Sequence, residues 1–153
     1  MQLAYDDNTD PNEREPMADE GFSTEERAAM KERAKELKAA KNKEDSEKEV
    51  LKKFAEMTPA DRVIGESLHK LVMSTAPDLL PKNWYGQPAY YLDGKVIVFF
   101  QSASKFKTRY SSLGFSEDAK LDDGVIWPTS FALLEWTPAV EKQVAALVKK
   151  AVG

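Results

Sequence analysis

Apolar side chains in the first half of the chain recur at spacings of three and four residues, the pattern of an amphipathic helix. The clearest series is Val63, Ile64, Leu68, Leu71, Val72 and Ala76. Thr58 and Pro59 precede this series and are typical of the N-cap and the first helical position. Pro77 follows it and disfavours a helical conformation at the residue before it. The pattern predicts a core helix over residues 59–76.

A charged segment nearer the N-terminus predicts a more weakly packed helix. Ser23 and Glu26 have the spacing of a capping box, which predicts a helix over residues 24–40. Its apolar positions form a thin stripe of Met30, Ala34 and Leu37. Such a stripe is too narrow for a core helix. We therefore expect a solvated or loosely docked helix, with binding to a partner as the alternative.

The polar segment Asn42–Asp45 is expected to end that helix, because it interrupts the apolar spacing. Ser46 and Glu49 then repeat the capping-box spacing. They predict a second helix whose apolar side carries Val50, Leu51, Phe54 and Met57.

The middle of the chain changes to the two-residue alternation of β-strands. Asp93-Gly94 predicts a hairpin turn, because both central residues of a type I′ turn need positive φ. The following run, residues 96–100, is apolar on both of its alternating sides, which indicates a strand near the centre of a sheet. Gly86 predicts a positive φ or a close backbone approach. Pro88 predicts a strand start or an edge.

Shorter segments complete the predicted sheet. Residues 105–115 alternate in part and predict a third strand, and residues 125–127 predict a fourth that Pro128 stops. Residues 131–136 are either a fifth strand or an irregular apolar segment. Thr137-Pro138 then starts a C-terminal amphipathic helix. The element order predicts an α+β fold, with an antiparallel sheet of four to five strands and helices packed on one face.

The distribution of charge divides the chain into three segments and argues against some classes of function. Residues 1–16 hold five acidic residues and one arginine, which account for the whole net charge of −4. We expect a disordered leader at 1–16, a charged helix at 17–45 and an α+β domain at 46–153. A neutral domain argues against nucleic-acid binding. The longest apolar run is too short to cross a membrane, and no apolar signal segment is visible, so we expect a cytoplasmic protein.

One short motif carries a family resemblance. Residues 85–90, Tyr-Gly-Gln-Pro-Ala-Tyr, fit an aromatic-Gly-x-Pro-x-aromatic signature. With the surrounding order of elements over roughly residues 47–152, this resembles the YdhG-like family, a bacterial domain of unknown function (number 1801). The resemblance implies a fold similar to the secretion chaperones and, for some members, a role as a frataxin-like iron chaperone. Members often carry a histidine after the lysine that matches Lys105, where this chain has Phe106 and Lys107.

The residues suggest two kinds of binding site. A cleft for an anionic small molecule or a peptide would use aromatic and basic side chains near the signature. Its candidates are Trp84, Tyr85, Gln87, Tyr90, Lys105, Lys107 and Arg109. Because the chain has no cysteine and one histidine, iron would need carboxylates. The metal candidates are Asp118, Asp122 and Asp123, with a second acidic cluster at residues 44–49. His69, the single histidine, is expected on a helix surface.

No motif of a nucleophilic, nucleotide-binding or phosphate-binding enzyme is present in the sequence. The prediction is therefore a non-enzymatic, cytoplasmic binding protein of the YdhG-like type, with iron as the cargo that the resemblance implies. The alternatives are a small-molecule or peptide-binding module that uses the aromatic residues 84–91, and a dimeric protein-interaction adaptor. The candidate partners are accordingly a metal, a small molecule, a second copy or another protein.

Overall fold

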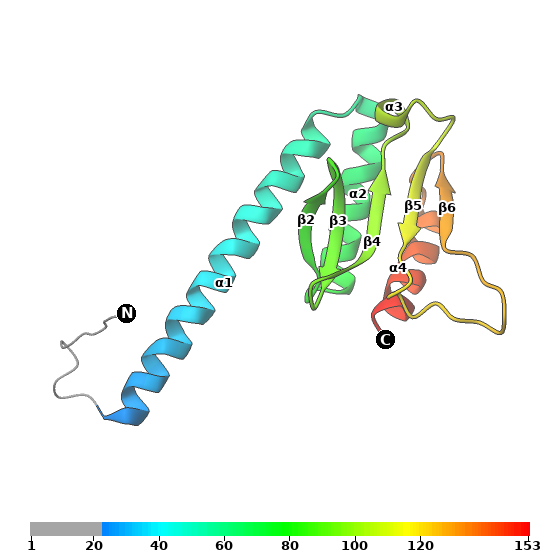
Figure 1. Ribbon diagram of the computed structural model, residues 1–153. Helices are drawn as coiled ribbons and strands as arrows, with labels where there is room; N and C mark the ends of the chain where they lie inside the picture. Colours follow the sequence, from blue (N-terminus) through cyan, green and yellow to red (C-terminus); the bar gives the residue numbers. More distant parts are fainter. Residues whose placement is uncertain (1–22) are drawn as a thin grey trace. The chain divides into compact units, whose positions relative to one another are not determined.

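The computed structural model of this chain describes residues 23–153 (Figure 1). The elements in chain order are α1 (Thr24–Ala55), α2 (Pro59–Thr75), β2 (Leu80–Trp84), β3 (Gln87–Leu92), β4 (Lys95–Gln101), α3 (Ala103–Phe106), β5 (Ser111–Phe115), β6 (Ser130–Leu133) and α4 (Pro138–Val152). The five strands form one antiparallel sheet in the order β2-β3-β4-β5-β6. This confirms the predicted α+β class. The predicted leader, residues 1–16, lies outside the described residues.

The chain separates into two compact units, Met1–Lys41 and Asn42–Gly153. In the first unit, the predicted capping box at the start of α1 is confirmed. The backbone N–H of Ser23 donates to Glu26 Oε1 at 2.9 Å, and the N–H of Glu26 donates to Ser23 Oγ at 3.0 Å. The hydrogen bonds with Ser23 lower the pKa of Glu26 below its ordinary value. Met30 and Leu37 of the thin apolar stripe are exposed.

The predicted break at Asn42–Asp45 is wrong, because α1 continues through it to Ala55. The segment contains neither glycine nor proline, and its residues each reduce helix stability by less than about 0.7 kcal/mol relative to alanine. Ser46 lies inside the helix and caps nothing. The last turns of α1 are fixed by packing, since Val50 and Phe54 are fully buried.

Both helices that begin with Thr-Pro form as predicted. The side chain of Thr58 accepts the N–H of Asp61 at the start of α2, and the side chain of Thr137 accepts the N–H of Val140 at the start of α4. Helices α2 and α4 pack on the same face of the sheet (Figure 1). The core between them and the sheet includes Leu68, Val72, Tyr90, Val98, Phe100, Leu113, Val144 and Val148. Val63 departs from the prediction, because 60% of its surface is exposed.

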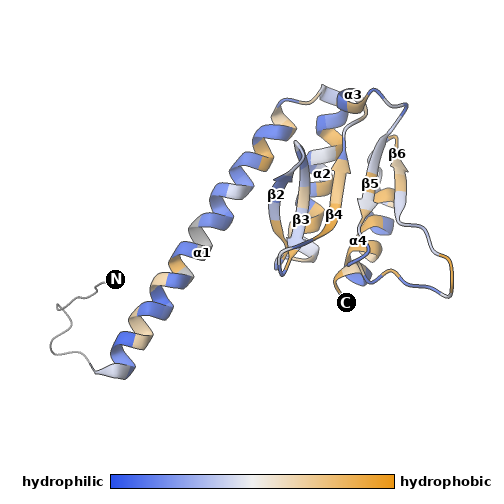
Figure 2. Cartoon of the chain, in the orientation of Figure 1, coloured by the Kyte–Doolittle hydropathy of each residue, from blue (hydrophilic) through white to orange (hydrophobic). Residues whose placement is uncertain are grey.

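The hairpin at Asp93-Gly94 is confirmed. Asp93 has φ 52° and Gly94 has φ 80°, as a type I′ turn requires. Strand β4 lies at the centre of the five-strand sheet, as its two apolar sides predicted. Figure 2 shows this strand as one of the most hydrophobic segments of the fold.

The observed strands differ from the prediction in four places. The segment Leu80–Trp84 was missed as a strand, because it is short and includes Pro81 and Lys82. Of the predicted third strand, only β5 forms, since the preceding residues make the short helix α3 and a loop. The predicted strand over 125–127 is a loop in which Val125 and Ile126 are exposed and Trp127 packs against the core. The predicted fifth strand is β6, which ends before Trp136.

No helix within residues 23–153 is both long and apolar enough to span a bilayer.

Candidate functional site

The two sides of the sheet have different environments. Residues directly opposite each other in an antiparallel pair lie on the same side. Tyr90 and Val98 pair and face the helices, whereas Ala89 pairs with Phe99, and Phe99 pairs with Gly114, on the other side. Within residues 42–153, helices α2 and α4 leave this second side uncovered (Figure 1). We call it the open face.

Three aromatic rings form a cluster on the open face. The Trp84 ring centroid lies 5.1 Å from that of Phe99 and 5.3 Å from that of Tyr85. These separations are typical of tilted and edge-to-face aromatic pairs. Phe99 lies directly over Gly114, where a Cβ atom would overlap the ring. Gly114 therefore lets Phe99 lie flat against the sheet and support Trp84.

Tyr85 occupies an unfavourable backbone conformation at the edge of this cluster. It forms the two-residue turn between β2 and β3 with Gly86, and the two residues have φ 50° and φ 76°. The Asp93-Gly94 turn has almost the same φ values but carries aspartate, a residue that this turn type favours. A bulky residue at positive φ is strained. The Tyr85 side chain is nevertheless 83% exposed, so burial in the core does not explain its presence.

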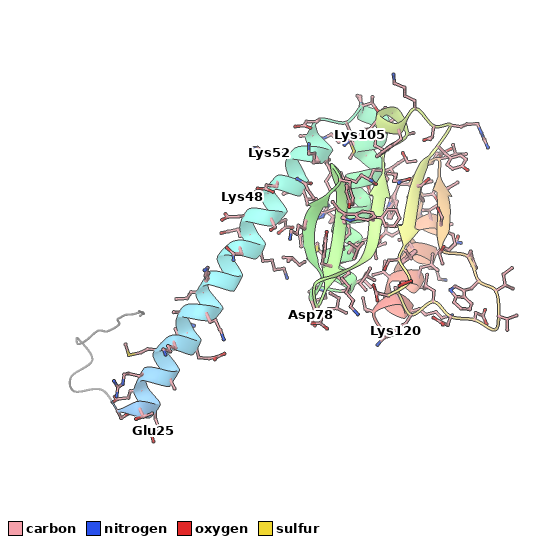
Figure 3. The ribbon with its side chains drawn as sticks, viewed as in Figure 1. Glu25, Lys48, Lys52, Asp78, Lys105 and Lys120 are labelled. Carbon is pink, nitrogen blue, oxygen red and sulfur yellow. The ribbon has the colours of Figure 1, made fainter. Side chains whose placement is uncertain are left out.

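A basic pocket lies beside this turn. Lys105 Nζ donates to the carbonyl oxygen of Gly86 at 2.7 Å, which links α3 to the turn. Figure 3 places Lys105 at the end of the sheet opposite Asp78 and Lys120. The pocket has a volume of about 410 Å³ and is lined by Lys53, Glu56, Met57, Gly86, Ser102, Ser104 and Lys105. Two ammonium groups and one carboxylate give it a positive balance, although Lys53 lies 3.7 Å from Glu56.

Asp61 holds α3, and with it Lys105, in place. This buried carboxylate of α2 accepts hydrogen bonds from Ser102 Oγ at 2.9 Å, Ser104 N at 2.9 Å and Ser104 Oγ at 2.6 Å. Burial by itself raises the pKa of Asp61. The hydrogen bonds from Ser104, Ser102 and Ser111 outweigh burial, and the pKa lies below its ordinary value. The first turn of α3 thus already binds an internal anion.

A second polar group, not predicted from the sequence, lies in the core. His69 Nδ1 is 2.9 Å from the Tyr90 hydroxyl, and His69 Nε2 is 2.8 Å from Glu47 Oε2. The expectation that His69 lies on a helix surface is wrong, because it is 7% exposed. Its position could have been found from the spacing of Gly65, His69, Val72 and Ala76, which continues the core side of α2. Burial, and then the charge of Glu47, raise the pKa of Tyr90.

The structure separates the predicted ligand-binding residues. Trp84, Tyr85 and Lys105 lie at the open face or its adjoining pocket, and Gln87 is buried opposite Trp84.

The other predicted positions do not belong to this site. Tyr90 is fully buried on the opposite side of the sheet and cannot contact a ligand there. Lys107 ends α3 with φ 55°, and its side chain is exposed. Arg109 lies over the ring of Tyr110 at 5.1 Å.

The predicted metal residues do not form a metal site in the described part of the chain. No group of three or more histidine or acidic side chains within residues 23–153 has a metal-binding arrangement. Asp118 instead lies 3.7 Å from Lys95 Nζ. Asp122 lines a pocket with Glu117 and Trp127, which does not include Asp118 or Asp123.

Comparisons with protein-family models, curated proteins and solved structures give no match for this chain. The candidate site therefore rests on this chain's own geometry, and the resemblance to the YdhG-like family stays a prediction.

Proposed function

We propose that this protein is a non-enzymatic binding protein whose site is the Tyr85 turn with its adjoining pocket. The ligand is a small organic anion with a planar ring. The ring stacks on Tyr85, and the anionic group is bound by Lys105 and Lys53. The observation that carries this proposal is the exposed Tyr85 side chain at positive φ, beside an ammonium group that is fixed on Gly86.

The physical argument starts from the cost of the turn. A left-handed conformation costs a bulky residue about 1–2 kcal/mol, which asparagine or glycine would largely avoid. Residues in such strained backbone conformations cluster at active sites and ligand-binding sites. An exposed ring next to a basic pocket offers one apolar surface and a few polar anchors, as small-molecule sites do.

The pocket favours an anion over a cation. The third pocket charge, Glu56, is already close to Lys53. Lys105 uses one of its three N–H donors on Gly86, which leaves two donors on the same ammonium group for a carboxylate. Hydrogen bonds between charged groups are about twice as strong as neutral ones. We therefore expect a carboxylate to bind better than a neutral amide of the same shape.

The iron cargo that the family resemblance implies is not part of this proposal, because the described carboxylates do not supply a site for it.

Titration with benzoate, followed by two-dimensional amide NMR, tests the proposed function. Benzamide is the control ligand, since it has the same shape without the charge. A fragment of this size is expected to bind with a Kd of about 1 mM or weaker. Benzoate should shift the resonances of residues 84–87 and 102–105, and benzamide should shift them several-fold less.

Three variants locate the binding groups. Tyr85→Asn and Lys105→Gln should each weaken benzoate binding several-fold. Lys107→Gln is the matched control, because Lys107 is an exposed lysine at the C-terminal end of α3 that does not line the pocket. Equal shifts with benzoate and benzamide, or equal effects of the two lysine variants, would refute the proposed site.

A further inference from the structure

The two edge strands of the sheet differ in how they are protected from pairing. Strand β2 forms one edge and β6 the other. An unprotected edge offers free N–H and C=O groups to another strand, and natural edges usually carry charge or proline. Strand β2 includes Pro81 and Lys82, whereas β6 and its flanking positions, Thr129 to Leu134, carry neither.

The register shows which backbone groups of β6 are directed outward. Phe115 N donates to the carbonyl oxygen of Thr129 at 2.8 Å, so Thr129 has its backbone groups toward β5. The direction of the backbone N–H and C=O groups alternates from residue to residue along a strand. Those of Phe131 and Leu133 therefore point toward β5, as those of Thr129 do. The N–H and C=O groups of Ser130, Ala132 and Leu134 therefore point away from the sheet.

The same reasoning shows that the other edge is blocked. Trp84 and Gln87 flank a two-residue turn and form a hydrogen-bonded pair in this type of hairpin. Alternation from Trp84 directs the backbone of Asn83 and Pro81 outward. Because proline has no N–H, the β2 edge lacks a donor where a new strand would need one.

We propose that β6 is a homodimer interface, at which β6 of a second copy pairs antiparallel with it across a two-fold axis at Ala132. In this register, Ala132 faces Ala132 of the other copy, and Ser130 faces Leu134. The outward N–H and C=O groups of the two strands then satisfy each other. No charged residue faces a like charge, and the small side chain at the axis permits close approach.

Exposed apolar residues next to β6 also support a second copy of this chain as the partner. Val125 and Ile126, in the loop that leads into β6, are 98% and 86% exposed. The proposed register places Pro128 opposite Trp136 of the other copy, so this loop extends toward the other copy's Trp136. Trp136 lines a groove of about 740 Å³ with the apolar residues Val63 and Leu71 and with polar and charged residues, Glu66, Ser67, Lys70, Ser74 and Glu141. The loop tip would be covered by that groove in a symmetric, isologous contact.

Sedimentation velocity of the full chain over a range of concentrations tests the interface. The wild type should show a dimer fraction that rises with concentration. Ala132→Lys, which places two like charges at the axis, and Ala132→Pro, which removes the outward N–H, should both be monomeric. Ala132→Ser, which keeps the N–H and adds no charge, should dimerise as the wild type does. Amide NMR of each variant checks that the fold is retained.

A crosslinking experiment tests the register independently of the charge and proline variants. The chain has no cysteine, so Ala132→Cys introduces a single thiol. A short bis-maleimide should crosslink this variant to a dimer, and it should not crosslink Lys82→Cys on the other edge. A wild type that stays monomeric at about 1 mM, or equal crosslinking of the two variants, overturns the proposal.

Discussion

His69 and Tyr90 satisfy each other's polar groups inside the core. The neutral histidine with its hydrogen on Nε2 fits all three groups, because Tyr90 donates to Nδ1 and Nε2–H donates to Glu47. A doubly protonated ring would leave the Tyr90 hydroxyl hydrogen without this acceptor. We therefore interpret the three residues as a structural connection between α1, α2 and β3. The hydroxyl of Tyr90 is fully buried, which excludes contact with a substrate.

Tyr90→Phe should lower the free energy of unfolding by about 1–3 kcal/mol, because it leaves buried Nδ1 without a partner. Glu47→Gln is the control, since its amide oxygen can still accept from Nε2–H and its side chain is partly exposed. We expect that variant to lose less than about 1 kcal/mol. Urea unfolding of both variants measures the difference. Equal losses would contradict the interpretation.

Predictions for single residues of the signature segment were confirmed at some positions and wrong at others. Gly86 was predicted to need positive φ or a close approach, and it has both, with φ 76° and Lys105 next to its Cα. Tyr85 was included for its aromatic ring, but its strain depends on a strand, β2, that the sequence did not reveal. Tyr90 was included among the ligand-binding candidates but lies on the side that α2 and α4 cover, and the local sequence does not show which side that is.

Helix α2 and the last turns of α1 pack through a glycine. A Cβ atom at Gly65 would lie 2.6 Å from Phe54 Cδ1, and Phe54 is fully buried. Helix propensity alone predicts that Gly65→Ala stabilises the protein by about 1 kcal/mol. Overpacking of a filled core costs roughly 1–3 kcal/mol, so we expect the opposite sign.

Thermal unfolding distinguishes the two expectations for Gly65→Ala. A net loss of 1 kcal/mol lowers Tm by about 2–4 °C in a chain of this size. Ser67→Ala, in the same helix, is the control for propensity and should not lower Tm. A higher Tm for Gly65→Ala would show that Phe54 can move aside.

Asp61 connects α2 to α3, and its contribution to the free energy of unfolding should depend on pH. Its pKa in the folded protein lies below the ordinary value of 3.8, so it stabilises the fold above about pH 4. That contribution is lost as pH falls through the lowered pKa. Asp61→Asn should therefore reduce the free energy of unfolding by about 1–3 kcal/mol at pH 7.

Urea unfolding of wild type and Asp61→Asn between pH 7 and pH 3 measures this dependence. The difference between them should shrink as pH falls below about 4. A difference that stays constant over this range would mean that the carboxylate charge is not what holds α3.

At the scale of elements, local signals predicted helices better than strands. The Thr-Pro starts of α2 and α4 and the Asp-Gly turn act within a few residues, and all three are confirmed. Strand β2 pairs with the neighbouring β3, but Pro81 and Lys82 interrupt the alternation by which a strand is recognised. Residues 125–127 are apolar but belong to no strand. The polar segment at Asn42–Asp45 was misread, because the packing of Val50 and Phe54 outweighs weak local preferences.

At the scale of the whole molecule, we interpret one side of the sheet as structural and the other as a binding surface. The side under α2 and α4 contains the core, and it includes the single histidine and Asp61 among its polar connections. The open face has the aromatic cluster, with Tyr85 at its end. We therefore expect the side chains under the helices to determine stability, and Tyr85 to be retained for binding at a cost in stability.

The free energy of unfolding of Tyr85→Asn tests this division most directly. Asparagine suits the left-handed turn, and the contact of the exposed Tyr85 with Trp84 is a small loss. We predict that the variant is as stable as the wild type or more stable by up to about 1 kcal/mol. The reciprocal change in the matching turn, Asp93→Tyr, should be destabilising. A loss of more than about 1 kcal/mol in Tyr85→Asn would contradict the account, because it would make Tyr85 a structural residue.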